Sequence, residues 1–299
     1  EYAFRKQIGN VGLYARFVDG VVLEPGFSLA CLCAPIRALA MYVRATRDIS
    51  ISYDRVVQAG VNKIIQLLMS RKHPNTALFS TMLLPNGELA LYPYTTFDNV
   101  FVWRCLKDLS WMYELIRDID RSEENANLAD QVKKAVLEHC IVDSPEGRLF
   151  ACGVDLNGAY HLYDSPKGSL ELLSWFGFCE PDDPVYMNTV EWIHSAESDR
   201  AESISVISVA NGLLAGRKEE VISLLGNFEL DDGIACEVVD KQSGRAVFGH
   251  ADAACAGYLA YALGSAIGAK LMGPEPEPSD KLYQPPPPEI RDRLQPRVM

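Results

Sequence analysis

The sequence lacks the residue groupings that usually mark a metal site or a disulfide framework. Its eight cysteines are scattered, none of them forms a C-x-x-C pair, and its five histidines do not cluster with them. Zinc sites need closely spaced thiolate or imidazole ligands, and disulfide scaffolds need a dense set of cysteines. We therefore predict no metal and no cofactor. Reduced cysteines in apolar surroundings suggest a reducing compartment, and we expect the cytoplasm.

Positive charge is also scarce in this chain. It has 28 lysines and arginines against 40 aspartates and glutamates, which gives a formal net charge of -12. Such an acidic protein repels nucleic-acid phosphates and anionic membrane surfaces, so we expect neither as a partner. The first residues show no signal-peptide pattern. Because Glu1 is not a start methionine, we expect that an N-terminal portion is missing. The composition leaves the oligomeric state open.

Long uncharged runs are nearly absent as well. The longest candidate is Ala253–Ala269, with 17 uncharged residues dominated by alanine, glycine and serine. A membrane-spanning helix needs about 20 predominantly apolar residues, so this run is marginal in both length and composition. We predict a small-residue helix that packs inside a helical domain. The sequence also shows no fixed repeat, which argues against an ordinary solenoid.

Helical patterns separated by loops are what the sequence does contain. Apolar residues recur at helical spacing, and Arg37 and Arg44 are expected largely on other faces of the first such helix. Strand is expected mainly in two stretches: residues 78–94, where a Pro-Asn-Gly turn indicates a hairpin or a loop, and residues 141–163, where two turns interrupt alternating residues. The predicted helices cover residues 28–45, 53–71, 95–119, 126–140, 170–178, 185–194, 204–215, 218–227 and 252–271.

This succession predicts an all-α fold, in which at least eight helices form antiparallel pairs around a shared axis. Such an (α/α) toroid would occupy residues 1–273, with a small antiparallel β excursion. The tail from 274 to 299 is rich in proline, including four consecutive prolines at 285–288. A tail of this composition is expected to be extended.

One stretch, from Tyr160 to Thr189, combines a polar turn with a buried helix. Asp164 lies in the turn DSPKGS, directly before the apolar run from Leu170 to Phe178. Aspartate and serine at this position are helix-start signals. Asp164 is therefore either an ordinary N-cap or a carboxylate held ready for a polar ligand, and local sequence leaves both interpretations open.

Several blocks of this chain match one known family in order. Residues 182–189 (DDPVYMNT) are nearly that family's DDPVYQNT, and residues 173–178 (LSWFGF) are similar to its LPYLGY. Residues 140–143 and 159–164 correspond to its YGIVEHPGFG and GNYLLMDDAN region, and residues 33–48 to an early helix that ends in KATGD. The chain thus resembles glycoside hydrolase family 125, the metal-independent exo-α-mannosidases with an (α/α)6 fold.

The resemblance implies roles for three carboxylates. Glu237, in residues 233–238 (GIACEV), falls at the family's GFMHESF and so at its general base. Glu88 falls near the acid motif RPSDDPC, and Asp98 stands at the family's SN position. Enzymes of this family invert the anomeric centre, and inversion places the two carboxyls about 6.5–9.5 Å apart around an attacking water.

The resemblance also implies residues that would hold the sugar. Asp164 matches one aspartate of MDDAN, and Asn99 follows Asp98 in the matched motif. Tyr94, His161 and His250 supply the aromatic and polar groups that a sugar site needs. The expected partner is an oligosaccharide or glycoside, most naturally an α-mannoside.

The chain departs from the family in four places. It has no counterpart of the early motif GDIPAMWLRDS, the SPHTG loop is missing between Ser198 and Ser203, HES has become CEV, and the acid motif keeps at most one carboxylate. Three functions therefore stay open. The first is exo-acting hydrolysis of an α-linked sugar with inversion, the second is an inactive carbohydrate-binding or scaffolding relative, and the third is a protein-interaction domain that uses the proline-rich tail.

Overall fold

The structure is a computed structural model that describes Phe4 and residues 8–16, 19–145, 147–163, 169–195, 202–229 and 234–269. The chain divides into two compact units, with the boundary between residues 138 and 139. The single domain over residues 1–273 stays a prediction, and the tail from 274 to 299 lies outside the described residues.

The first unit is built on helices that the sequence predicts well. Helix α2 (Leu29–Thr46) begins where the Ser28 side chain accepts a hydrogen bond from the Cys31 N–H, and it ends at Arg47 with a left-handed φ of 62°. Helix α3 (Arg55–Met69) begins at Asp54, whose side chain caps two N–H groups. Capping at these positions satisfies donors that have no partner inside the helix. Both helices present an apolar face to the core.

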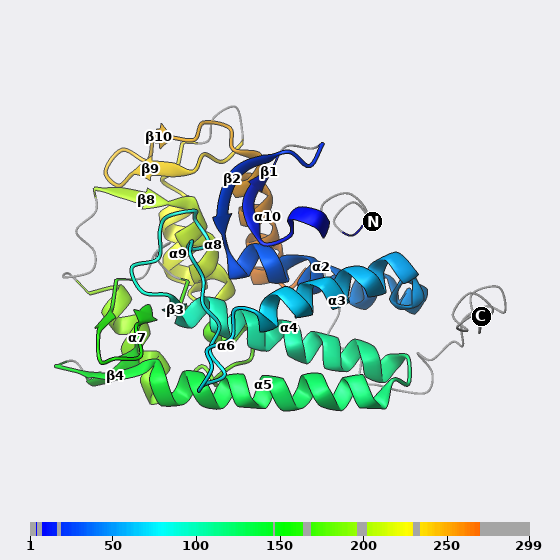
Figure 1. Cartoon of the computed structure of the whole chain (residues 1–299). Coiled ribbons are helices and arrows are strands. Elements are labelled where there is room, and N and C mark those ends of the chain that lie inside the picture. Colours follow the sequence, from blue (N-terminus) through cyan, green and yellow to red (C-terminus); the bar gives the residue numbers. More distant parts are fainter. Residues whose placement is uncertain are drawn as a thin grey trace, which may run out of the picture. The chain divides into compact units, whose positions relative to one another are not determined.

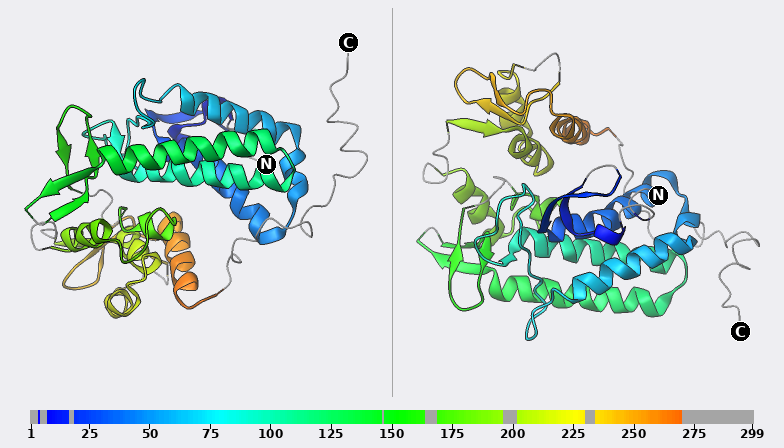
Figure 2. Two further views of the ribbon diagram at one scale, coloured as in Figure 1. Left: turned by 90° about the horizontal axis from the view of Figure 1, so that it is seen from below. Right: turned by 45° about the horizontal axis from the view of Figure 1, so that its top comes forward.

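Helices α4 (Thr96–Leu115) and α5 (Ile119–His139) form an antiparallel pair, which Figures 1 and 2 show from three sides. Ser122 Oγ donates a hydrogen bond to the Ser110 carbonyl at 2.9 Å, and the Lys133 ammonium lies 5.5 Å from the centre of the Trp103 ring. The first contact connects the two helices close to the turn between them, and the second connects their middle parts. A helical hairpin is therefore a basic element of this unit.

The predicted start of α5 at residue 126 is wrong. Residues 123–125 were expected as an acidic connector, but they lie inside the helix, and the turn falls at residues 116–118, where Arg117 has a φ of 60°. Ser122 and Asn125 are buried although they are polar. Polar residues on the inward face hide the periodicity that the prediction relied on.

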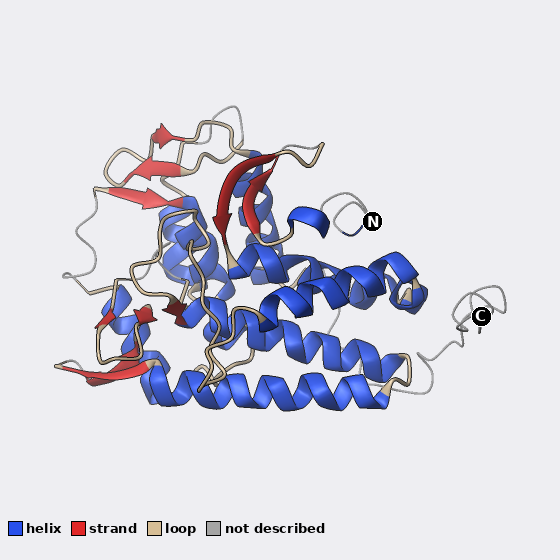
Figure 3. Ribbon diagram, in the orientation of Figure 1, coloured by secondary structure: helices blue, strands red, loops and turns tan. Residues whose placement is uncertain are grey.

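Strand in the first unit differs from the prediction. Strands β1 (Leu13–Arg16) and β2 (Val22–Phe27) pair antiparallel. Of the hairpin and the loop that the sequence left open for residues 78–94, the structure forms the loop, with two isolated bridges, Lys72 with Phe79 and Leu83 with Leu89, before the two-residue β3 (Tyr94–Thr95). Figure 3 shows this long loop in tan. Two short 3₁₀ segments, Ile8–Asn10 and Ile49–Tyr53, complete the unit.

The β excursion predicted for residues 141–163 is confirmed in the second unit. Strands β4 (Ile141–Ser144) and β5 (Gly147–Phe150) form a hairpin, as do β6 (Gly153–Val154) and β7 (Tyr160–His161). The first hairpin packs on helix α7 (Pro184–Ile193), because the Thr189 hydroxyl accepts a hydrogen bond from the Phe150 N–H at 2.9 Å. The DDPVYMNT block therefore supplies a helix that anchors the excursion.

The remaining helices of the second unit are short. Helix α6 (Leu172–Trp175) is one turn, shorter than the predicted 170–178, and α9 (Lys218–Leu225) has two turns. Helices α8 (Val206–Leu214) and α10 (Ala253–Ala266) pack together, and the Tyr258 hydroxyl of α10 donates to Asn211 Oδ1 of α8 at 2.7 Å. The described residues thus contain nine α-helices, as the prediction of at least eight requires.

A three-stranded sheet in the second unit was not predicted. Strands β8 (Ser203–Ser205), β9 (Val238–Asp240) and β10 (Ala246–Phe248) pair antiparallel in the order β10-β9-β8. Strands of three residues are too short to show a period-2 pattern in sequence. Glu237, which the family resemblance predicts as the general base, immediately precedes the central strand of this sheet.

Within the part of the chain that the structure describes, one helix is long and apolar enough to cross a membrane by length and composition alone. It is α2, with 18 residues, a mean hydropathy of 1.3 and 44% of its residues buried within the protein. A buried core helix passes the same test. The run Ala253–Ala269, considered as a span from sequence, forms only the 14-residue α10.

Candidate active site

Glu237 is held by its backbone at the start of β9. Its N–H donates to the Gly249 carbonyl at 3.1 Å, and its own carbonyl accepts from the Val206 N–H at 2.9 Å. The side chain is half-buried. Hydrogen bonds on both sides of the peptide fix where the side chain leaves the backbone, and partial exposure keeps the carboxylate within reach of water. Such a carboxylate can accept a proton from a water molecule.

The turn from β10 to α10 passes beside Glu237. Gly249 and Ala251 in this turn both have left-handed backbones, with φ of 62° and 50°. Asp252 then caps α10, because its Oδ1 accepts from the Cys255 N–H at 2.7 Å. His250 is exposed between the two left-handed residues. The structure therefore brings Glu237 and the predicted sugar ligand His250 into the same turn region.

The Cys255 thiol is a neutral member of this group. Its burial raises the pKa of Cys255 to about 12, and the hydrogen bond and charge of Asp252 and the charge of Glu237 act in the same direction. A thiol with this pKa carries no charge near pH 7. Cys255 therefore gives the site a small apolar wall rather than a nucleophile.

Asp98 and Asn99 lie in the first turn of α4, and both are fully buried. The Asn99 side chain accepts from the Phe79 N–H at 2.8 Å and donates to the carbonyls of Phe79 at 3.1 Å and Thr95 at 2.8 Å. These hydrogen bonds tie the loop of residues 78–95 to α4. Any effect of Asn99 on a sugar would therefore act through the position of this loop.

Asp98 has an unusual protonation equilibrium for an aspartate. Its burial raises the pKa of Asp98 to about 7, while hydrogen bonds from the Thr95 hydroxyl and the Ala30 backbone lower it only in part. The Thr95 hydroxyl donates to Asp98 Oδ2 at 2.6 Å. A carboxylic acid that keeps its proton near neutral pH has the protonation state that a general acid requires.

The raised pKa of Asp98 predicts a pH-dependent stability. The folded pKa lies above the unfolded one, so the contribution of Asp98 is fully present below about pH 4 and is lost as the pH rises through 7. The stability that Asp98→Asn gains relative to the wild type should therefore grow as the pH rises from 4 to 7. It should reach about 1.4 kcal/mol for each unit by which folding raises the pKa of Asp98. Urea unfolding at pH 4.5 and pH 8 measures the difference. If the unfolding free energies of Asp98→Asn and the wild type differ by the same amount at both pH values, the raised pKa of Asp98 is contradicted.

Tyr94 and Glu88 lie on the same loop of the first unit in different surroundings. Tyr94 is half-buried, and its ring meets the His73 ring edge-on with 5.6 Å between the centroids. Partial burial raises the pKa of Tyr94, so its hydroxyl stays protonated. Glu88 is exposed in a tight turn, where its N–H donates to Asn86 Oδ1 at 3.2 Å and Gly87 has a φ of 86°.

His161 lies on β7, opposite Gly153 of β6. Burial lowers the pKa of His161, and a hydrogen bond with the Tyr163 backbone opposes this effect. A lowered pKa keeps the imidazole neutral near pH 7, where it can both donate and accept hydrogen bonds to sugar hydroxyls. Asp164, the carboxylate at the centre of the sequence prediction, lies outside the described residues.

The structure thus gathers five of the predicted residues into two local groups. Tyr94, Asp98 and Asn99 lie within six residues at the start of α4 in the first unit, and Glu237 and His250 lie beside the ends of β9 and β10 in the second. That Glu88, Asp98, Asp164 and Glu237 line one cavity stays a prediction: Glu88 and Asp98 belong to the first unit, Glu237 belongs to the second, and Asp164 lies outside the described residues.

Two buried ionic clusters were missed from sequence. In the first unit, Asp108 is fully buried and accepts hydrogen bonds from three guanidinium groups: Arg37 at 2.8 Å, Arg44 at 2.7 Å and Arg104 at 2.9 Å. The expectation that Arg44 lies away from the buried face is wrong, since its side chain is only 5% exposed. Its long stem lets it reach an aspartate on α4 that no local pattern reveals.

In the second unit, the buried Glu171 is the centre of the other cluster. Arg217 donates to Glu171 through Nε at 2.8 Å and Nη2 at 3.3 Å, and His194 Nε2 lies 2.7 Å from the same carboxylate. The Tyr186 hydroxyl donates to the Glu171 carbonyl at 2.8 Å. Glu171 therefore joins the segments around α6, α7 and α8.

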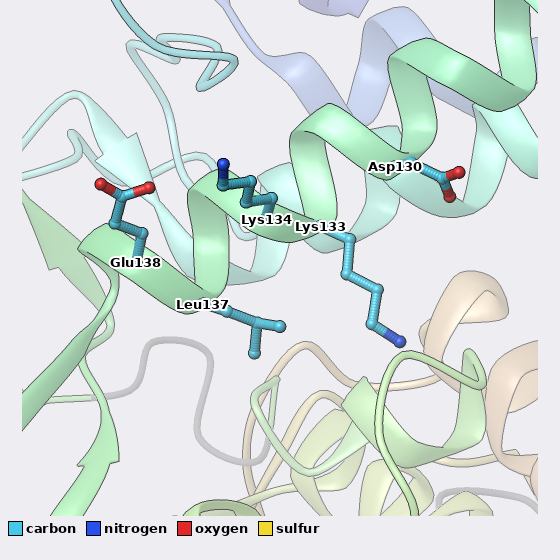
Figure 4. A pocket seen from close by; sticks show the side chains of 5 residues that line it. All are labelled: Asp130, Lys133, Lys134, Leu137 and Glu138. Carbon is cyan, nitrogen blue, oxygen red and sulfur yellow. The ribbon is translucent and has the colours of Figure 1, made fainter.

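A hollow of ≈ 540 Å³ lies along α5. Asp130, Lys133, Lys134, Leu137 and Glu138 line it. Figure 4 shows Lys133 and Leu137 extending from one side of the helix and Lys134 from another. No predicted site residue is among these five, so the hollow does not add to the candidate site.

Comparison with known sequences places the chain near one family. The family model described as metal-independent alpha-mannosidase (GH125) matches residues 70–200. The chain is also 30% identical over 127 residues to the meiotically up-regulated gene 157 protein of Schizosaccharomyces pombe, a match that covers 42% of this chain and 25% of that protein. The chain thus spans about a quarter of the length of this curated relative.

Comparison with solved structures establishes the fold. A metal-independent alpha mannosidase of Streptococcus pneumoniae, in a non-productive complex with α-1,6-mannobiose, matches with a TM-score of 0.70 at 15% identity, over 84% of this chain and 71% of that one. A bacterial glucoamylase complexed with acarbose matches with a TM-score of 0.67 at 16% identity, over 90% and 46%. The predicted all-α fold of (α/α)6-toroid type is confirmed, and over residues 70–200 the chain is similar to the GH125 family.

Proposed function

We propose that this chain acts as a metal-independent exo-α-mannosidase that hydrolyses its substrate with inversion. The observation that carries the proposal is the family match over residues 70–200, which contains Glu88, Asp98, His161 and Asp164. The fold likeness to the Streptococcus pneumoniae mannosidase supports it. The preferred substrate class is an oligosaccharide that ends in an α-linked mannose.

In this proposal Glu237 is the general base. Its half-exposed carboxylate would take a proton from the water that attacks the anomeric carbon, on the face opposite the leaving group. The attack inverts the configuration, so the first product is the β-anomer of the free sugar. The hydrogen bonds of its backbone to Gly249 and Val206 fix where its side chain leaves the backbone before substrate arrives.

Asp98 or Glu88 would supply the proton to the leaving oxygen. Asp98 has the pKa that this role needs, whereas Glu88 has the exposure that contact with a substrate needs. His161, Tyr94 and His250 would hold the sugar by stacking and hydrogen bonds. The choice between the two acids remains part of the proposal.

Free mannose released from a panel of α-1,2-, α-1,3- and α-1,6-linked mannobioses, in the presence of EDTA, tests the proposed function. We expect release from at least one substrate at an unchanged rate with the chelator, because neither the sequence nor the described residues contain a ligand cluster for a metal. Activity that EDTA removes and a divalent ion restores would contradict a metal-independent mechanism. Sugar binding without any release would favour the carbohydrate-binding alternative.

A further inference from the structure

Gly249 lies directly against the Glu237 side chain. Residue 248 pairs with residue 238 at the end of β9 and β10, and the Glu237 N–H then donates to the Gly249 carbonyl at 3.1 Å. A Cβ atom placed on Gly249 would lie 2.4 Å from Glu237 Cβ and 2.9 Å from Glu237 Oε2. Real Cβ atoms essentially never approach other heavy atoms to under 3.0 Å. The carboxylate therefore occupies space that exists only because residue 249 has no side chain.

A rotamer change of Glu237 cannot relieve such a collision. The nearest atom is Glu237 Cβ, which is fixed to the backbone, and the Glu237 nitrogen would also lie only 3.2 Å from the added carbon. Either the β9 start or the turn of residues 249–251 would have to move. That turn already contains a non-glycine residue in the left-handed region, Ala251, with a φ of 50°. Unfavourable backbone conformations of this kind persist where the surrounding structure holds them, and they are frequent at functional sites.

We propose that Gly249 is a positioning residue for Glu237: its bare Cα and its carbonyl together set the place of the catalytic carboxylate. The proposal rests on the proposed function for its catalytic consequence, but not for its geometry. It assigns to residue 249 a role that neither the motif GIACEV nor the family match over residues 70–200 assigns. A displacement of a catalytic group by about 1 Å costs on the order of 10²-fold in rate.

The test compares two glycines of the same unit that have similar backbones and different surroundings. Gly268 has a φ of 73°, against 62° for Gly249, and a Cβ on Gly268 would meet no atom within 4 Å. Gly249→Ala should lower kcat on α-mannosides on the order of 10²-fold with little change in KM, because it moves the base and not the sugar ligands. Gly268→Ala bears the same backbone cost and should keep the kcat of the wild type.

A double variant separates positioning from a general structural effect. Because residues that act as a unit are not additive, Gly249→Ala should cause no further loss in a Glu237→Gln background. An additional loss of similar size there would show that Gly249 acts through something other than Glu237. Asparagine tolerates the left-handed region but carries a Cβ, so Gly249→Asn with the control Gly268→Asn provides a second pair if the alanine variant fails to fold.

Crystal structures of Gly249→Ala or Gly249→Asn decide the question independently of turnover. The expected result is a displaced Glu237 carboxylate in the residue 249 variants and an unmoved one in the residue 268 controls. An unmoved carboxylate overturns the inference. If Glu237→Gln loses activity while the residue 249 variants keep theirs, only this inference fails. If Glu237→Gln keeps full activity, or the wild type releases no sugar, the proposed function fails, and the carboxylate position still decides the role of Gly249.

Discussion

Replacing Glu237 with glutamine should lower the rate of α-mannoside hydrolysis on the order of 10²–10⁴-fold, the range typical for the loss of general-base assistance. Glutamine has nearly the shape of glutamate and keeps a hydrogen-bonding oxygen, but it cannot take a proton from water. The backbone hydrogen bonds of residue 237 to Gly249 and Val206 do not involve the side chain, so they remain. The fold and sugar binding should therefore be retained.

The matched control is Glu229→Gln in the same unit. Glu229 is exposed and pairs with exposed Arg245 at 3.1 Å, so its charge loss should leave turnover unchanged. Thermal melts of both variants check folding, and a binding titration with mannobiose checks the sugar site. Turnover near the wild-type value in Glu237→Gln would remove Glu237 from the mechanism.

Asp108→Ala is expected to destabilise the first unit by about 3–5 kcal/mol, the usual cost of removing one partner from a buried ion pair. The substitution leaves Arg37, Arg44 and Arg104 around an empty position, with side chains that are 15%, 5% and 16% exposed. Their mutual repulsion is then no longer balanced by the carboxylate between them. Arg44 also lies 4.3 Å from the centre of the Trp111 ring, so its displacement disturbs apolar packing on α4.

The pH dependence of this loss follows from the pKa of Asp108. Burial alone would raise the pKa of Asp108, but the charges of the three arginines outweigh it, and the pKa is lowered. A lowered folded pKa means that the stabilisation is present above the unfolded value of about 4 and is lost as the pH falls through the folded value. Denaturant unfolding should therefore show a large difference between wild type and Asp108→Ala at pH 7 that shrinks in acid.

Asp130→Asn provides the control for this measurement, because Asp130 is exposed on α5 of the same unit. Surface substitutions of this kind usually change stability by less than about 0.5 kcal/mol. A change of that size for Asp108→Ala would mean that the arginine cluster is not held together by Asp108.

The long helices could be predicted from sequence because their apolar residues recur with a clear period. Leu29 to Val43 marks α2 and Val56 to Leu68 marks α3, and the structure buries these faces. Helix α6 was predicted too long because the run from Leu170 to Phe178 is apolar throughout. A fully apolar run shows that a segment is buried but not where its helix ends.

Other features could not be predicted because they join residues far apart in the chain. Arg44 and Asp108 are 64 residues apart, and Glu171 and Arg217 are 46 apart. The contact between Gly249 and Glu237 depends on the pairing of β9 with β10, strands too short to be seen in the sequence. The candidate site residues were predicted mainly by matching motifs to a family. The motif match predicts Glu237 as the general base, but it does not predict the contact of Glu237 with Gly249.

The most direct test of the account is the anomeric configuration of the first sugar released, followed by ¹H NMR during hydrolysis of an α-mannoside. General-base attack by water opposite the leaving group requires inversion, so the β-anomer of mannose should appear first and then equilibrate with the α-anomer. Initial appearance of the α-anomer would contradict the account, because it requires a covalent intermediate and a nucleophilic carboxylate in place of a base at Glu237.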